Sequence, residues 1–403
     1  MKKTARPLET TLLRLIWDEG QISRAEIARQ AELSRSTVSQ IVGTLISAGL
    51  VAEVGVGPSS GGRRPIVLQF RDDAYSILGI EMGATHVAVT LTNLRGRVLA
   101  WEQHDHPVRT DPRGTRLLID TLCDACLASV PEDRRQLVGI GVAVPSPVHP
   151  TNPDWLSEVV LPEWQGRLGL HDLERKHGVP LLVDNDANLG ALAEQWWGAG
   201  IGKMNFSYIK IGTGVGSGHV IGGEVYRGST GVAGEVGHLS IDPKGKPCVC
   251  GLRGCLATLV GGGALVERAK ELSRDFPASV LSGREATVAE IEDAALAGDP
   301  LALQVTREAA GYLATAVAGI LNLLNPDMIV LGGGLARVGE LLLKPLRDTV
   351  KSQTLVSSLA ASEIRASTLG PRTVAIGAAT FALKSALEDW RKFPAPLSAS
   401  EKP

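Results

Sequence analysis

The sequence has no long hydrophobic run and no secretion signal. No stretch reaches the ~18 consecutive apolar residues that a membrane-spanning helix needs. The opening, MKKTARPLETTLLRLIW, is basic, but it has neither an unbroken apolar core nor a cleavage site of small residues. These absences argue against a membrane anchor and against secretion. We therefore expect a cytoplasmic protein with no membrane partner.

Cysteine is scarce, with five residues in the chain of 403. Disulfides are rare in a reducing compartment, so the few cysteines favour a metal site or no special role. Three of them lie in CVCGLRGC, residues 248–255, and GEVGH ends at His238, ten residues before this motif. One imidazole and three thiolates make a full tetrahedral set that leaves no position for water. The composition predicts a structural zinc site with the ligands His238, Cys248, Cys250 and Cys255.

Ordinary burial as small apolar side chains is the alternative for these cysteines. Turn residues surround them, rather than a strand or a helix face, which disfavours that alternative. The other two, Cys123 and Cys126, have C-x-x-C spacing but lie inside an apolar helical pattern. We interpret this second pair as ordinary residues of a helix.

The net charge is also low, at −2, but it is unevenly distributed. Residues 1–71 carry ten Lys and Arg against six Asp and Glu, and the remainder carries 31 against 37. The N-terminal part is therefore mildly basic and the rest acidic. This difference suggests a polyanionic partner for the first part only.

Three helical patterns follow one another near the N-terminus, at about residues 8–18, 24–30 and 35–48. Ser23 and Ser34 precede the second and third patterns, where their hydroxyls can cap the first N–H groups. The short AEL segment between these two patterns predicts a helix-turn-helix. Polar and basic side chains at the start of the third helix suit a DNA major groove. These side chains are Arg35, Ser36, Thr37, Ser39 and Gln40.

The segment LVAEVGVGPSSGGRRPIVLQF is typical of two strands joined by a glycine-rich tip. Its tip holds Arg63 and Arg64, which could follow phosphates or enter a narrow minor groove. Residues 1–71 are thus predicted to form a winged helix-turn-helix that binds double-stranded DNA. A three-helix domain that docks onto another protein is the alternative.

From Tyr75 onward, apolar strands alternate with helices, which indicates the α/β class. Strands ending in glycine-rich turns recur near Phe206 and in DMIVLGGGLA, and such turns let backbone N–H groups approach phosphate oxygens. We predict two α/β lobes, residues 72–193 and 194–403, that face each other across a cleft. The residues in these turns predicted to resemble phosphate-binding loops are Gly212, Thr213, Gly214, Gly216, Gly332 and Gly333.

Five motifs in this order resemble the ROK family (repressor, open reading frame, kinase), in its regulator branch with an N-terminal winged helix. They are VDNDANLGALAE, IGTGVGSG, GVAGEVGH, CVCGLRGCL and VLGGGLA, and the resemblance covers nearly the whole chain. It implies a two-lobed body of the actin-like ATPase fold, with a sugar in the cleft. It also implies a homodimer or homotetramer assembled through the second lobe, and a C-terminal helix that packs back on the first lobe.

The resemblance also implies roles for single residues. It places Asn185, Asp186, Glu235 and His238 around the sugar, and it agrees with zinc on His238 and the three cysteines. Zinc would fold GEVGH onto the cleft, with one ring nitrogen of His238 on the metal and the other toward the ligand. In ROK kinases the residue matching Asp186 is the general base.

Two departures from the kinase pattern argue against catalysis. The kinase loop D-x-G-G-T-K is replaced by EMGATH, which keeps Gly83 and Thr85 as phosphate-loop-like residues but has Glu81, Ala84 and His86 at the altered positions. The kinase motif C-L-E is replaced by CLA, with Ala257. Glutamate displaces the charge by about 1.5 Å, which disturbs octahedral Mg²⁺. We therefore expect neither ATP nor Mg²⁺ as a cofactor.

The sequence thus favours a sugar-responsive transcriptional regulator, a repressor, whose cleft senses a sugar or sugar phosphate. One alternative is an ATP-dependent sugar kinase that also binds DNA, since Asp186 and the loop Gly212–Gly218 are retained. Another is an architectural DNA-binding protein with an inert, zinc-stabilised body. The sequence names neither the sugar nor the operator.

Overall fold

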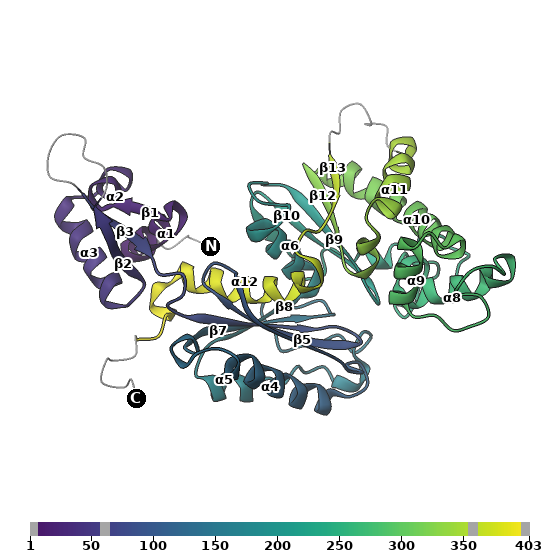
Figure 1. Ribbon diagram of the computed structural model, residues 1–403, viewed down its shortest axis with the longest axis horizontal. Helices are drawn as coiled ribbons and strands as arrows, with labels where there is room; N and C mark the ends of the chain where they lie inside the picture. Colours follow the sequence, from purple (N-terminus) through teal and green to yellow (C-terminus); the bar gives the residue numbers. More distant parts are fainter. Residues whose placement is uncertain (1–6, 57–64, 354–361, 396–403) are drawn as a thin grey trace.

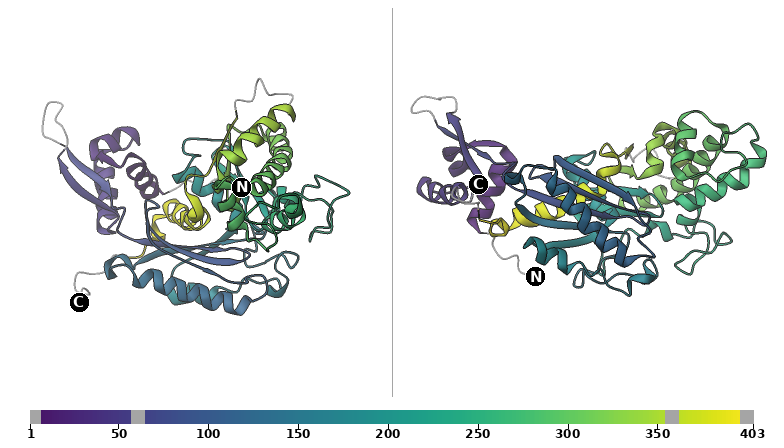
Figure 2. Two further views of the ribbon diagram at one scale, coloured as in Figure 1. Left: turned by 45° about the vertical axis from the view of Figure 1, so that its right-hand side comes forward. Right: turned by 60° about the horizontal axis from the view of Figure 1, so that its bottom comes forward.

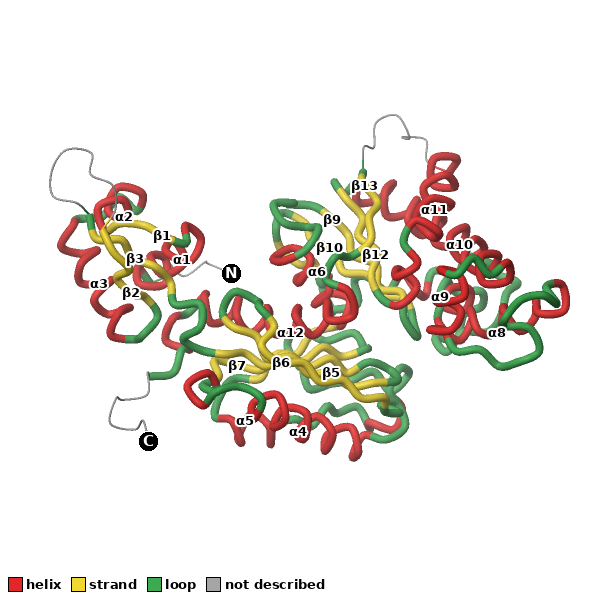
Figure 3. Tube along the Cα trace, viewed as in Figure 1, coloured by secondary structure: helices red, strands yellow, loops and turns green. Residues whose placement is uncertain are grey.

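The computed structural model describes residues 7–56, 65–353 and 362–395 (Figure 1). It consists of a small N-terminal head and two α/β lobes, each built on a five-stranded sheet. Figure 3 shows the two large sheets with helices packed around them. Among the described residues, no helix is both long and apolar enough to cross a membrane.

The head is a three-helix unit with a small antiparallel sheet. Its helices are α1 (Leu8–Glu19), α2 (Arg24–Gln30) and α3 (Arg35–Ser47), and its strands are β1 (Gln21–Ser23), β2 (Val51–Val56) and β3 (Ile66–Phe70), in the order β1-β3-β2. Ser23 accepts a hydrogen bond from the Glu26 N–H, and Ser34 accepts one from the Thr37 N–H. Both predicted caps are therefore confirmed, and all three helices lie where the periodicity predicts them.

The first large sheet has the strand order β6-β5-β4-β7-β8. Its strands are β4 (Ser76–Met82), β5 (His86–Asn93), β6 (Val98–Asp105), β7 (Leu137–Val144) and β8 (Leu181–Asn185). β5 is antiparallel to both of its neighbours, β4 and β6, while β4, β7 and β8 are parallel. Helices α4 (Pro112–Ala128) and α5 (His171–His177) cover one face (Figure 1). Cys123 and Cys126 are buried on α4, as predicted for helix residues.

The second large sheet has the order β11-β10-β9-β12-β13. Its strands are β9 (Phe206–Ile211), β10 (Val215–Ile221), β11 (Glu224–Tyr226), β12 (Met328–Gly332) and β13 (Glu363–Ala366). The helices of this half are α7 (Ala257–Val260), α8 (Gly262–Leu272), α9 (Val288–Leu296), α10 (Pro300–Leu324) and α11 (Glu340–Gln353). Apolar side chains of these helices and of β9 and β12 form one core.

Two helices lie between the large sheets. Helix α6 (Asp186–Trp197) packs on β9 and β10, and α12 (Thr373–Glu388) packs on α6 and on strands β4 and β7. The close approach of α12 to the first sheet depends on glycine, since a Cβ at Gly141 would lie 1.8 Å from the Ala378 carbonyl oxygen. The predicted division at residues 193 and 194 falls inside α6.

Candidate functional site

A cavity of about 710 Å³ opens where the two lobes meet, and residues of both line it. The cavity brings together residues that are far apart in the sequence, from the first strand of the body to the start of α12. The predicted residues that line it are Gly83, Asn185, Asp186, Gly212, Thr213, Gly214, Gly216, Glu235, His238, Cys248, Gly332 and Gly333. Thr85 is exposed and is not part of the lining.

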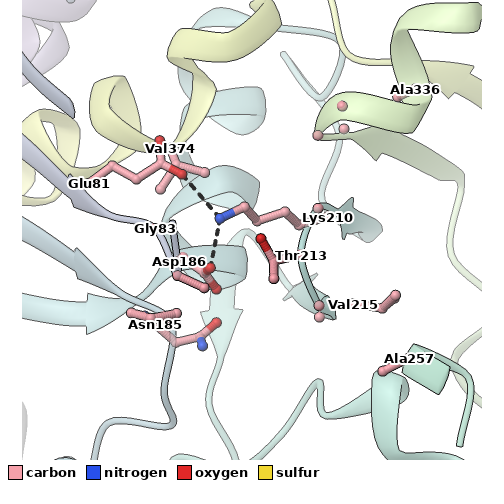
Figure 4. A pocket seen from close by; sticks show the side chains of 18 of the residues that line it. Glu81, Gly83, Asn185, Asp186, Lys210, Thr213, Val215, Ala257, Ala336 and Val374 are labelled. Carbon is pink, nitrogen blue, oxygen red and sulfur yellow. Dashed lines mark hydrogen bonds and ion pairs between the residues drawn. The ribbon is translucent and has the colours of Figure 1, made fainter. Parts of the chain in front are cut away.

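A partly buried lysine connects the two lobes inside this cavity. The ammonium of Lys210, on β9, lies 2.7 Å from Asp186 Oδ2 and 3.1 Å from Glu81 Oε1 (Figure 4). Burial opposes the charge on Glu81, but Lys210 and His86 outweigh it and lower the pKa of the Glu81 carboxyl to about 2. Burial also opposes the charge on Lys210, yet the two carboxylates raise its pKa. The three groups form a charged triad.

The sequence analysis did not identify Lys210. A signal was present, because YIKIGTG places one lysine in a strand that is otherwise apolar. A charged residue in a buried strand needs a partner. The strand itself does not indicate that Lys210 has two partners, or that they come from two different segments of the chain.

Asn185 and Asp186 stand at the start of α6, directly after β8. The Asn185 Oδ1 accepts hydrogen bonds from the N–H groups of Ala187 and Asn188, at 2.9 and 3.2 Å, and so caps the helix. Its Nδ2 donates to the Ser146 carbonyl oxygen. Asp186 occupies the first turn, where the helix dipole favours a negative charge. The cap thus fixes the direction of both side chains at the wall of the cavity.

Glu235 and His238 face the same cavity from the loop after β11. Burial, together with the charge of Asp186, raises the pKa of the Glu235 carboxyl to about 7. Its Oε2 lies 3.8 Å from Nε2 of His238, whose pKa is lowered by burial. The loop passes very close to β10, because a Cβ at Gly234 would lie 1.9 Å from the Ser217 carbonyl oxygen.

A buried histidine on β10 connects this loop to the sheet beneath it through hydrogen bonds. The two ring nitrogens of His219 lie 2.8 Å from the Ser207 hydroxyl and 2.9 Å from the Ser217 hydroxyl, which donates in turn to the Gly234 carbonyl oxygen. Burial lowers the pKa of His219 to about 4, so the ring is neutral at pH 7. A chain of hydrogen bonds therefore runs from β9 to the residue before Glu235.

The predicted metal ligands form a compact cluster. One potential ligand atom from each of His238, Cys248, Cys250 and Cys255 lies within 4.8 Å of the others. The Nδ1 of His238 is 3.5 Å from the Cys248 sulfur, and the sulfurs of Cys250 and Cys255 are 3.6 Å apart. A tetrahedron with metal–sulfur bonds of 2.3 Å has edges of about 3.8 Å, so the cluster fits such an ion. These four residues could hold a metal.

The two ring nitrogens of His238 face different partners. Nδ1 points to the cysteine cluster, and Nε2 points to Glu235 and the cavity. The two nitrogens could therefore serve different partners. A metal on Nδ1 would hold the ring, and with it the position of Glu235, at the wall of the cavity.

In the altered loop after β4, the side chain of His86 fills the space beside the backbone of Gly83. The Nε2 of His86 lies 3.6 Å from Glu81 Oε1, and a Cβ at Gly83 would meet the His86 ring at 2.3 Å. The ring thus covers the backbone that a phosphate would have to approach. At another side of the cavity, Ala257 presents only a methyl group (Figure 4).

The start of α3 presents a polar surface on the head. Arg35, Ser36, Ser39 and Gln40 are exposed, whereas Thr37 is partly buried and its hydroxyl lies 2.8 Å from that of Ser34. Arg63 and Arg64 lie outside the described residues. The exposed residues are free to contact another molecule without disturbing the core of the head.

Comparison with known proteins gives matches over both parts of the chain. The winged helix-turn-helix DNA-binding profile matches residues 7–52, and the ROK family profile matches residues 77–385. The xylose repressor of Caldicellulosiruptor bescii is 31% identical over 95% of this chain and 96% of its own. The DNA-binding transcriptional dual regulator NagC of Escherichia coli is 30% identical over 85% of this chain and 84% of its own.

Solved structures agree with these sequence relatives. A ROK family transcriptional regulator, a homologue of E. coli MLC protein, superposes with a TM-score of 0.77 at 28% identity, covering 96% of this chain and 98% of its own. A ROK family glucokinase from Streptomyces griseus, in complex with glucose and AMPPNP, gives 0.68 at 29% identity, covering 77% and 99%. The regulator covers the head and the body, while the kinase covers 77% of this chain. The chain belongs to the ROK family, and its head is a winged helix-turn-helix.

Proposed function

We propose that this protein is a sugar-responsive DNA-binding transcriptional repressor, in which residues 1–71 bind the operator and the cleft between the lobes binds the sugar. One observation carries the proposal: a head with an exposed polar helix is joined to a cavity lined by Asn185, Asp186, Glu235 and His238. Hydroxyl groups need such fixed polar partners, because an unpaired buried group costs free energy. The relatives named as xylose repressor and as NagC support this function.

The charged triad favours a sensor over a kinase. A general base must be able to take a proton, and the carboxylate of Asp186 is already paired with the Lys210 ammonium at 2.7 Å. Glu81, the residue that replaces the kinase aspartate, is bound to the same ammonium. The sugar kinase that also binds DNA remains the second candidate, because Asp186 and the glycine-rich loop at Gly212 line the cavity.

The first experiment titrates sugars into a complex of the full chain with its DNA site, selected from random duplexes by the protein itself. D-xylose, N-acetylglucosamine, glucose and their available phosphates are tested by fluorescence anisotropy. We expect at least one to change the operator Kd by about tenfold, or 1.4 kcal/mol. Glu235→Gln should abolish the response, while Glu285→Gln on the exposed surface should not. If no sugar changes DNA affinity, the sensor function is contradicted and the architectural role is favoured.

A phosphoryl-transfer assay with the same sugars and ATP tests the second candidate. We expect no turnover above the background of an Asp186→Asn variant. Turnover above about 1 s⁻¹ in the wild type would instead identify a kinase.

We further propose that the ligand of the cysteine cluster is Zn²⁺ in a structural role, held by His238, Cys248, Cys250 and Cys255. When bound, zinc supplies a fixed tetrahedral centre that holds the loop carrying Glu235 against the cleft. Elemental analysis should give one zinc per chain. Chelation should lower the melting temperature and weaken sugar binding together. A metal-free protein with unchanged stability after chelator treatment would contradict this assignment.

A further inference from the structure

Three of the seven tryptophans meet where the head contacts the body. Trp17, on α1, packs against Trp196 and Trp197 at the end of α6, with ring centroids 5.4 and 6.3 Å apart. The rings of Trp196 and Trp197 are themselves 5.7 Å apart. We call these three residues the tryptophan joint. In Figures 1 and 2 the head lies beside α12, which α1 also contacts.

Polar interactions fix the geometry of the tryptophan joint. The Arg95 guanidinium lies 4.2 Å from the Trp17 ring centroid, and Arg14 lies 4.8 Å from it on α1. Arg95 also donates a hydrogen bond to the Trp17 carbonyl oxygen, and the indole N–H of Trp17 donates to the Leu94 carbonyl oxygen. Stacked aromatic and cationic groups of this kind favour a small number of orientations. The joint is therefore a specific contact rather than a loose apolar one.

Helix α6 connects the tryptophan joint to the cavity. It begins at Asp186 in the cavity wall and ends at Trp197, and its 12 residues span about 18 Å. Near its end, the buried carboxylate of Glu194 accepts a hydrogen bond from Ser367, which also lines the cavity. The indole N–H of Trp197 donates to Thr380 on α12. Because α6 is packed along its length, a shift at its start must move its end.

We propose that α6 and the tryptophan joint transmit occupancy of the cleft to the orientation of the DNA-binding head. This inference rests on the proposed function and identifies the structural elements that connect the sugar site to the DNA-binding head. A ligand that contacts Asn185 and Asp186 differently in two positions of α6 favours one of those positions. The joint then converts the position of α6 into an orientation of α1 and, through the core of the head, of α3. Packed interfaces of this kind change between discrete arrangements rather than deforming continuously.

The first test uses the full chain labelled with 5-fluorotryptophan and assigns the ¹⁹F signals of Trp17 and Trp196 through Trp→Phe variants. We expect both signals to shift when D-xylose, N-acetylglucosamine or glucose binds. The sugar concentration at the midpoint of the shift should agree with the Kd of the sugar measured by calorimetry. A test without ligand is Asn185→Ala, which removes the cap of α6 at the cavity and should also shift the Trp17 signal. Thr287→Ala removes the cap of α9 in the same way and should leave that signal unchanged.

The second test measures coupling, which is the ratio of operator Kd with and without the sugar. Trp17→Leu and Trp196→Leu should lower this ratio by about fivefold or more, toward one, while sugar affinity changes less than about twofold. Trp17→Phe keeps an aromatic ring and should keep most of the coupling. Leu8→Ala, an exposed position on the same helix, serves as the control. Thermal melts of each variant identify any loss of folding.

The outcomes separate this inference from the proposed function. If no sugar binds or changes DNA affinity but Asn185→Ala shifts the Trp17 signal, the sugar-sensing function fails while the mechanical route stands. If a sugar changes DNA affinity, yet Trp17 and Trp196 signals stay fixed and both leucine variants retain full coupling, the route through α6 is overturned.

Discussion

Lys210 lies between two carboxylates that belong to distant segments, Glu81 on β4 and Asp186 on α6. Glu81 has an exposed fraction of only 3%, so its charge depends on this ammonium. We predict that Lys210→Met lowers the free energy of unfolding by about 3–5 kcal/mol, because it leaves a buried charge without its partner. The measurement is equilibrium unfolding in denaturant.

Two further variants make this prediction specific. Adding Glu81→Gln to Lys210→Met should recover part of the loss, because the orphaned charge is removed. Lys351→Met, at an exposed position of α11, should change stability by less than about 0.5 kcal/mol. A single Lys210→Met variant as stable as the wild type would show that the triad contributes nothing to the fold.

His219 predicts a dependence of stability on pH. Its pKa in the folded protein is about 4, below the ordinary 6.5, so the unfolded chain takes up a proton first as pH falls. The contribution of neutral His219 to the free energy of unfolding is therefore complete above pH 6.5. It is lost as pH falls toward 4, by at most about 3 kcal/mol. Unfolding at pH 7 and pH 4.5 should show a smaller loss for His219→Gln than for the wild type. His104→Gln, an exposed histidine on β6, should behave like the wild type.

At the scale of elements, α12 can pack closely on the first sheet because the facing position on β7 is a glycine, Gly141. A Cβ at Gly141 would collide with backbone atoms of Ala378, which cannot move without moving the helix. We predict that Gly141→Ala lowers the free energy of unfolding by about 1–3 kcal/mol or more. Gly311→Ala, inside α10 where the new Cβ would meet nothing within 4 Å beyond the backbone of its own helix, should be neutral or stabilising by up to ~1 kcal/mol. Equal effects of the two substitutions would contradict this account.

At the scale of the whole molecule, one chain carries one head, so a repressor that reads a symmetric operator needs two chains. Half-sites for such dimers lie on one face of DNA, separated by whole turns of ~10.5 base pairs. We predict that inserting about 5 base pairs between half-sites weakens binding by about 100-fold, since only one head can then engage. Inserting about 10 base pairs restores part of the affinity. Identical affinities for all three spacings, measured by gel shift, would indicate that the heads act independently.

The sequence by itself determined the local elements of this protein. The helices of the head follow from apolar periodicity and from caps such as Ser23 and Ser34, and both signals act within a few residues. The cluster of His238 and three cysteines was equally predictable, because three of its four residues lie within eight positions of the sequence. The glycine-rich turns were placed by the strands that precede them, whereas the start of α6 at Asp186 was not predicted, since the predicted lobe boundary falls inside this helix.

Only the tertiary structure decided which distant residues meet. The partner of Lys210 is 129 residues away in Glu81, and Trp17 meets Trp196 across the junction between head and body. The segments YIKIGTG and LLRLIW do not predict these partners, because the contacts of Lys210 and Trp17 depend on how the sheets, α6 and α12 pack together. Periodicity and capping report the conformation of a segment, whereas charge pairing and aromatic packing are determined by the arrangement of segments in space.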